Sequence, residues 1–290
     1  MRTKLVRVGL GIVLLMGLFF SARQVWDAKR AEQASREAAQ IAGLPGSVSA
    51  SVRLVSMETD VQERTDTVKE GGIETLDEGV KGAAETLPKE AAALAGIDLR
   101  GLQEVNQDVL GWIAIPGTKL SYPIVQGEDN DEYLYRNWKK ENNKSGSIFL
   151  ESTNRPDFSD FHTIIYGHRM RDNSMFGILK YYQKRDFLEG HPDIYLVSQD
   201  AVFRYRIFAA YETGVKSMVY RLDLEEKGLE EEFIEFCRES SVVDARVIPE
   251  PEPQVLTLST CTGRGHSTRW VVQGYLTQTY SVHRYPEEEP

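Results

Sequence analysis

Apolar and polar positions alternate along most of the chain from residue 112 onward, and this pattern predicts a protein made mostly of β-strands. The β-rich runs are short, unevenly spaced and separated by turns built from Gly, Pro, Asn and Asp. There are eight of them, at residues 112–115, 120–126, 147–150, 162–168, 193–197, 202–213, 254–261 and 269–280. Runs of this kind predict a mostly antiparallel barrel or sandwich.

Helical periodicity appears in three places around these strands. Asp98 is a suitable N-cap for a short helix with one apolar face. The apolar positions of that helix are Leu99, Leu102 and Val105. Two helical inserts are expected between strands, at residues 174–182 and 222–240, and the second lies just before the last two strands.

The first 24 residues have the pattern of a membrane anchor. Arg2, Lys4 and Arg7 precede an uncharged run over residues 8–20, which is short for a bilayer span but can be extended by a snorkelling Arg7. The residues that follow match a signal-peptidase site poorly, so an uncleaved anchor is expected. Basic residues ahead of the span predict a cytoplasmic N-terminus and an extracellular remainder.

Residues 25–97 differ from the rest of the chain in composition. They are rich in Ala, Glu, Thr, Ser and Gly, and no aromatic residue occurs between Trp26 and Trp112. Such a segment cannot bury enough apolar surface to fold alone, so we expect an acidic stalk that acts as a spacer in preference to binding a partner. The folded core is then expected to start near residue 98, with a catalytic domain over residues 98–284 and a frayed tail at 285–290.

Charge and cysteine content narrow the function classes. A formal net charge of -10 argues against a nucleic-acid partner, which would require a clustered basic face. There is no C-x-x-C motif or cluster of His and Cys, so metal binding has no support. One of the two cysteines, Cys237, falls on the apolar face of the 222–240 insert and is expected to be a packed free thiol instead of a disulfide partner.

Cys261 is the main candidate for chemistry. It lies on the same face of its strand as Ser259, and a loop over residues 262–268 leads to a second strand that begins at Arg269. If the two strands pair as a hairpin, Cys261 faces Arg269, and acyl transfer needs such a nucleophile beside a cationic oxyanion donor. A tyrosine-phosphatase cradle is excluded, because Ser267 occupies the position of its Arg and a strand follows where a helix is required. These features alone leave catalysis and structural burial of Cys261 equally open.

A proton acceptor would complete the site, and two histidines compete for that role. His168 ends the strand 162–168, directly after a glycine that permits close backbone approach. His266 lies in the loop between Cys261 and Arg269 and needs no assumption about the fold. We choose His168, and His162 is expected at the opposite end of the sheet because it opens the same strand.

Four motifs occur in a fixed order along residues 98–283: GWIAIPGTKLSYPIVQGEDNDEYL, GSIFLE, TIIYGHRMRDNSMFGILKYY, and TLSTC followed by RWVVQGYL. Together they resemble the sortases. The helix before GWI, the YGH to SMFG run and the long helical insert favour class B. The resemblance implies a mostly β fold: a closed eight-stranded β-barrel with an N-terminal helix, and a helical insert before the penultimate strand that walls the substrate groove.

The resemblance also implies roles for individual residues. Cys261 corresponds to the nucleophile, His168 to the general acid/base and Arg269 to the oxyanion stabiliser. Positions that line the class B substrate groove correspond to Asn130, Leu134 and Ser259. The segment TGRGHST between Cys261 and Arg269 departs from the longer class B versions.

The implied activity is that of a cysteine transpeptidase of a Gram-positive cell surface. It would cleave an Asn-Pro-x-Thr-x-like sorting signal of secreted proteins after Thr and transfer the acyl group to an amine of the peptidoglycan. Two alternatives remain: a pilin-polymerising sortase that uses a protein lysine as acceptor, and a non-catalytic surface binding module on the same barrel. The resemblance implies no metal and no cofactor, and it implies a single-pass membrane protein with its catalytic domain outside the cell.

Overall fold

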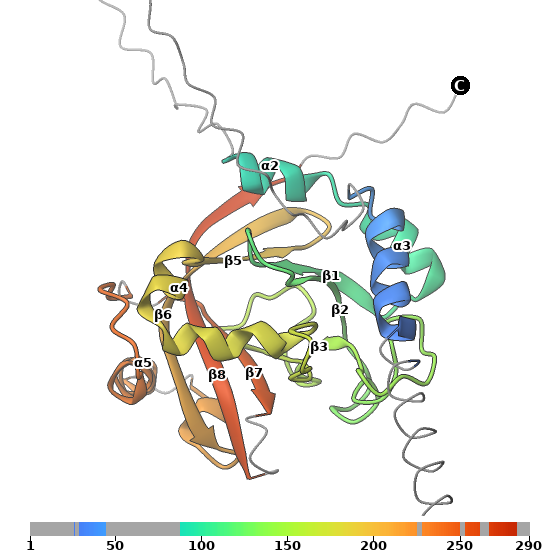
Figure 1. Ribbon diagram of the computed structural model, residues 1–290. Helices are drawn as coiled ribbons and strands as arrows, with labels where there is room; N and C mark the ends of the chain where they lie inside the picture. The colour runs from blue at the N-terminus through green and yellow to red at the C-terminus, as the bar shows by residue number, and fades with distance from the viewer. Residues whose placement is uncertain are drawn as a thin grey trace, which may run out of the picture.

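The computed structural model describes residues 26, 29–44, 88–224, 228–249, 253–261 and 267–282. Eight strands close into a barrel in the order β1-β2-β3-β4-β7-β8-β6-β5 (Figure 1). Their bounds are β1 Val109–Ala114, β2 Ser121–Val125, β3 Ile148–Leu150, β4 His162–Tyr166, β5 Asp193–Val197, β6 Ala201–Gly214, β7 Val255–Cys261 and β8 Thr268–Ser281. The predicted closed eight-stranded barrel is confirmed, and each predicted strand is present with ends shifted by a few residues at most.

Two of the eight strand pairings are parallel, namely β2 with β3 and β4 with β7. The other six are antiparallel, so the barrel is mixed although mostly antiparallel. The parallel pair β4 and β7 matters most for function. Parallel neighbours bring their carboxyl ends to the same edge of a sheet, so the residues that follow β4 lie beside the end of β7.

Alternation along β7 separates an inner from an outer face. Leu256 and Leu258 belong to the main core inside the barrel, whereas Val255 belongs to a second cluster under the helix α5 (Leu229–Ser240). Thr257 and Ser259 share the face of Val255 and are also buried. β7 therefore directs Thr257 and Ser259 to the outside of the barrel.

The remaining helices are α2 Lys89–Ala95, α3 Leu99–Val105, η1 Phe176–Gln183, α4 Arg185–Gly190 and η2 Met218–Tyr220. Two of them, α3 and η1, lie where helices were predicted, whereas α2, α4 and η2 were not predicted. Asp98 accepts a hydrogen bond from the Gly101 amide at 3.0 Å, as expected of an N-cap. Val105 was expected on the buried face but is 49% exposed, because the helix ends there and the chain turns to the extended Asn106.

The two helical inserts differ from expectation in form and extent. η1 is a 3₁₀ helix, and Phe176 and Leu179 on it pack into the barrel core. α5 begins at Leu229 and not at residue 222, because Gly228 adopts a left-handed φ of 91° immediately before it. Leu224, ahead of that turn, packs into the cluster beneath α5 without being helical.

The folded core starts earlier than residue 98, which corrects the sequence prediction. Residues 29–41 form a helix that lies beside α3, and both it and α2 pack against the barrel (Figure 1). The buried positions of this helix are all alanines, namely Ala34, Ala38 and Ala39, and Ala42 in the turn that follows is buried as well. Because alanine has little apolar surface, this buried face adds little hydrophobicity to the sequence, and the segment does not look like part of a core. Two parts of the expected stalk, residues 29–44 and 88–97, thus belong to the folded body.

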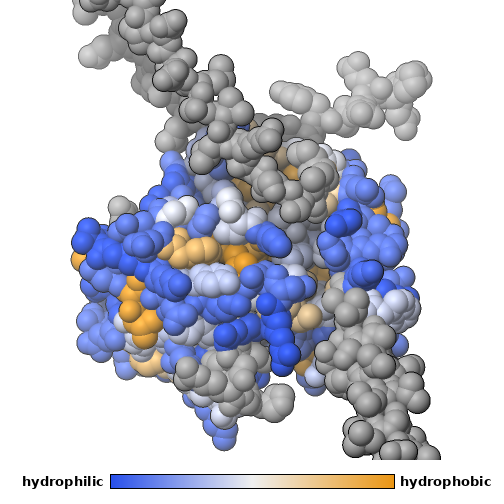
Figure 2. Space-filling view, in the orientation of Figure 1, coloured by the Kyte–Doolittle hydropathy of each residue, from blue (hydrophilic) through white to orange (hydrophobic). Residues whose placement is uncertain are grey.

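The surface turned to the viewer in Figure 2 is mostly hydrophilic, with small apolar patches. Within the part of the chain that the structure describes, no helix is long and apolar enough to cross a membrane. The expected anchor at residues 1–24 and the expected tail at 285–290 lie outside the described residues.

Candidate active site

Strand register brings the three proposed catalytic positions to one level of the barrel. Tyr166 of β4 pairs with Ser259 of β7, and the Gly167 amide donates a hydrogen bond to the Ser259 carbonyl at 3.3 Å. Continuing this parallel register by two residues sets His168 beside Cys261. On the other side of β7, Cys261 pairs with Arg269 of β8, which confirms the predicted hairpin pairing.

The half-buried His168 is held by the loop between β2 and β3. Its Nε2 lies 2.7 Å from the Leu134 carbonyl oxygen. A carbonyl oxygen can only accept, so Nε2 carries the proton and donates it, which leaves Nδ1 as the nitrogen available for proton transfer in the neutral ring. The ring of Tyr135 lies 5.8 Å from the His168 ring, centroid to centroid.

Gly167 lets the chain that follows β4 pass close to β3 and η1. A Cβ atom there would lie 2.5 Å from Ile148 Cδ1 and 2.9 Å from the Phe176 ring. The Phe176 amide also donates to the His168 carbonyl at 3.0 Å. The backbone of His168 is therefore fixed between β3 and η1, as expected for a glycine that permits close backbone approach.

Arg269 begins the strand that faces Cys261. Its side chain is half-buried, and Nη1 donates to the Thr268 carbonyl at 3.1 Å. Burial raises the pKa of the neighbouring Tyr166 hydroxyl, the Glu151 carboxylate raises it further, and the charge of Arg269 acts in the opposite direction. The guanidinium thus contributes positive potential at the level of the barrel where Tyr166 and Ser259 pair.

A polar network next to this level includes two residues that sequence reasoning did not single out, Glu151 and Tyr166. The Tyr166 hydroxyl donates to Glu151 Oε2 at 2.8 Å, and Asn130 Nδ2 donates to Glu151 Oε1 at 2.6 Å. Asn130 Oδ1 in turn accepts from the Ser152 amide at 2.9 Å. Tyr166 could have been found from alternation, because it precedes His168 by two residues and so shares its face.

The other two proposed groove residues lie close to the same level. Ser259 is 1% exposed, and its Oγ is 2.9 Å from the hydroxyl of Tyr220 in η2. Leu134 is half-buried and packs against the apolar cluster that contains Trp112 and Ala38, while its carbonyl accepts from His168. Tyr220 gave no signal in the sequence, because it reaches Ser259 only through the fold.

The remaining histidine and cysteine candidates lie elsewhere. His162 is buried at the start of β4, with Nδ1 2.8 Å from the Arg221 carbonyl and Nε2 2.8 Å from Thr257 Oγ1, and burial lowers its pKa to about 4. Cys237 is a free, buried thiol whose pKa burial raises to about 11, as expected of a packed cysteine. His266 lies outside the described residues, and among those described no group of His, Cys, Asp and Glu could hold a metal ion.

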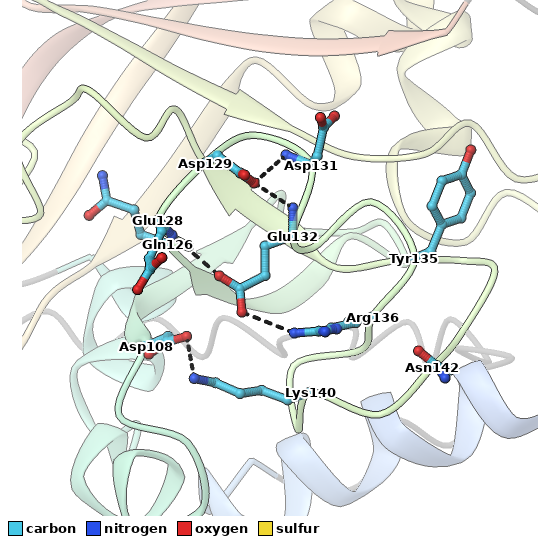
Figure 3. A pocket seen from close by; sticks show the side chains of 11 residues that line it. Asp108, Gln126, Glu128, Asp129, Asp131, Glu132, Tyr135, Arg136, Lys140 and Asn142 are labelled. Atoms are coloured by element: carbon cyan, nitrogen blue, oxygen red, sulfur yellow. Dashed lines mark hydrogen bonds and ion pairs between the residues drawn. The ribbon is translucent and has the colours of Figure 1, made fainter.

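A polar depression of about 810 Å³ is lined by Tyr135 and by residues of the loop after β2 (Figure 3). Its acidic side chains are largely held by neighbours within the depression. Asp108 contacts Lys140 at 2.8 Å, and Glu132 contacts Arg136 at 3.2 Å. Asp129 Oδ1 accepts from the amides of Asp131 and Glu132, both at 2.9 Å, so the carboxylates of this depression are bound mainly within their own loop.

The chain is similar to known proteins of the sortase family. The sortase domain model matches residues 113–277. Sortase B of Listeria monocytogenes is 39% identical over 181 residues, which are 62% of this chain and 74% of that protein. Sortase B of Staphylococcus aureus is 34% identical over 160 residues, which are 55% of this chain and 66% of that protein.

Solved structures show the same relationship. A Staphylococcus aureus sortase B–substrate complex superimposes with a TM-score of 0.59 and 32% identity, covering 62% of this chain and 84% of that one. Clostridium perfringens sortase B superimposes with a TM-score of 0.59 and 29% identity, covering 62% of this chain and all of the other. The chain therefore belongs to the sortase family of cysteine transpeptidases, and its relatives lie among the sortase B proteins.

Proposed function

We propose that this sortase cleaves an Asn-Pro-x-Thr-x-like sorting signal after its Thr and transfers the new acyl group to an amine of the cell wall. Cys261 would be the nucleophile, His168 the general acid/base and Arg269 the oxyanion stabiliser. The observation that supports these roles is the register of three adjacent strands, in which Cys261 lies between the end of β4 and the start of β8.

The first half of the reaction forms a thioester. The Cys261 thiolate attacks the Thr carbonyl carbon, and the oxygen gains negative charge that the Arg269 guanidinium stabilises. The C–N bond then breaks as His168 gives a proton to the leaving nitrogen, so the C-terminal fragment departs as an amine. Since Nε2 of His168 donates to Leu134, Nδ1 would carry the transferred proton.

The second half regenerates the enzyme. An amine attacks the thioester carbon and gives a proton to His168, a C–N bond forms, and the C–S bond breaks to release the Cys261 thiolate. The imidazole thus ends the cycle protonated, as it began. Asn130, Leu134 and Ser259 would line the groove for the sorting signal. Because the side chain of Asn130 is bonded to Glu151 and Ser152, its contribution would be to fix the groove wall as well as to contact the peptide.

Membrane attachment through residues 1–24 would place the enzyme where secreted proteins and wall precursors meet. The expected orientation, with the catalytic domain outside the cell, rests on the basic residues that precede the apolar run.

A peptide-library screen of the full-length protein, with and without candidate amines, tests both substrates at once. Cleavage after Thr of Asn-Pro-x-Thr-x peptides, with transfer to a wall-peptide amine, is the expected result. Transfer only to a protein lysine would favour the pilin-polymerising alternative. Peptide binding without cleavage, and without labelling of Cys261 by a thiol-reactive mimic, would favour the binding module.

A further inference from the structure

We propose that the helix over residues 29–41 positions the catalytic histidine through the loop of residues 133–147. This inference rests on the proposed role of His168 and adds a positioning function to a segment whose sequence suggested only a spacer.

The helix contacts the loop through specific polar bonds. The indole Nε1 of Trp138 donates to the Ala34 carbonyl at 2.8 Å, and both residues are buried. Lys139 Nζ forms an ion pair with Glu37 Oε2 at 2.6 Å. A simple spacer helix would have no need of such a directed buried bond.

Close packing accompanies these bonds. Ala31, Ala34 and Ser35 of the helix face Asn143 and Gly146 of the loop across a cavity of only about 20 Å³. The small alanine side chains allow the helix to approach the loop this closely, and a larger residue on this face would displace one or the other.

The loop is braced internally, so a displacement at one end is transmitted to the other. Its two arms are joined by the Asn143 amide donating to the Tyr135 carbonyl at 2.8 Å and by the Ser147 amide donating to the Tyr133 carbonyl at 3.1 Å. The Ser147 hydroxyl also donates to the Arg136 carbonyl at 2.8 Å. These bonds connect the helix-facing side of the loop to the residues on either side of Leu134.

At its other end the loop holds His168. The Leu134 carbonyl accepts the Nε2 proton, and Gly146 lies against both groups, since a Cβ atom there would be 2.5 Å from the Leu134 oxygen and 3.0 Å from His168 Cδ2. A shift of the helix would therefore loosen the bond that selects the tautomer of His168. The helix acts through Leu134, which makes it a positioning element without direct contact to substrate.

The first test is a charge exchange in the full-length protein in detergent micelles. Glu37→Lys should lower kcat/KM about fivefold and shift the pH profile, and adding Lys139→Glu to it should restore both to within about twofold of wild type. The matched control exchanges Glu32 and Arg36, an exposed pair at 2.6 Å whose two members both belong to the helix, and should leave the activity unchanged.

The second test does not depend on turnover. Nitrogen-15 NMR of labelled histidine should show that the neutral form of His168 is the Nε2–H tautomer in the wild type and a mixture of tautomers in Ala38→Glu, which puts a charge into the buried face of the helix. The wild-type tautomer and pH profile in a folded Ala38→Glu protein would overturn the proposal. If that variant does not fold, an unaltered kcat/KM in Glu37→Lys overturns it. A wild-type enzyme that cleaves no peptide would refute the proposed function, whereas the tautomer measurement would still decide this inference.

Discussion

Gly146 offers a sharp test of how the β2–β3 loop controls His168. Gly146→Ala adds one methyl group at a left-handed residue with φ of 59°, in a place where the new Cβ would lie 2.5 Å from the Leu134 oxygen and 2.8 Å from the Tyr133 oxygen. The Leu134 oxygen would have to move by about 0.9 Å to reach ordinary van der Waals separation. A movement of this size away from His168 would lengthen the 2.7 Å bond beyond the limit of about 3.2 Å for a well-formed N–H···O bond.

Gly146→Ala is expected to lower both the folding stability and the catalytic efficiency, and the two effects have different causes. The backbone strain of a non-glycine residue at positive φ costs about 1 kcal/mol of folding stability, and displacement of the acid/base by about 1 Å costs about 100-fold in kcat/KM. Gly228→Ala is the matched control, since Gly228 also has a positive φ, 91°, but a Cβ there would meet no atom within 4 Å. Peptide cleavage by both variants, together with thermal unfolding, separates strain from displacement. Equal activity of the two variants would refute the reasoning.

Three further predictions follow from single side chains. Arg269→Ala should lower kcat about 100-fold with the fold intact, measured by steady-state cleavage, and an unchanged kcat would exclude oxyanion stabilisation by Arg269. Cys237 should not react with a thiol reagent at pH 8 in the folded protein, because it is fully buried and its pKa is raised to about 11, so a count of two reactive thiols before denaturation would contradict the packing. Burial lowers the pKa of His162 to about 4 in the folded protein, whereas the pKa in the unfolded chain is about 6.5. As the pH falls from about 6.5 towards 4, the unfolded chain therefore binds the proton first. The free energy of unfolding falls over this range, by about 2 kcal/mol at pH 5. His162→Gln should flatten this dependence in urea titrations at pH 7 and pH 5, and an unchanged slope would show that His162 is not its source.

The barrel could be predicted from the sequence because its strands have a clear period of two. The predicted bounds of β5 are the same as the observed ones, and the pairing of Cys261 with Arg269 followed from a single predicted hairpin. The parallel pairing of β4 with β7 could not be read from the strands themselves, since it depends on strands far apart in the chain lying side by side. The choice of His168 over His266 rested on its position at the end of a strand after Gly167, agreed with the family resemblance, and remains a prediction.

Features that depend on small or distant residues were missed. The helix over residues 29–41 buries only alanines, so its packing face produces no strong hydrophobic signal. The start of α5 was placed too early because Leu222 and Leu224 continue the apolar pattern, whereas the backbone of Gly228 sets the true boundary. The bond from Tyr166 to Glu151 joins the end of β4 to the residue after β3, and it depends on the antiparallel pairing of these two strands.

The most direct test of the account is the mass of the enzyme during turnover. Full-length protein incubated with an Asn-Pro-x-Thr-x peptide, without an amine, should gain the mass of the fragment that ends in Thr, with the adduct on Cys261. Addition of a wall-peptide amine should remove the adduct and yield the joined product, and Cys261→Ala should give neither adduct nor product while unfolding at the wild-type temperature. Undiminished cleavage by Cys261→Ala, or an adduct on another residue, would contradict the central claim that Cys261 is the nucleophile.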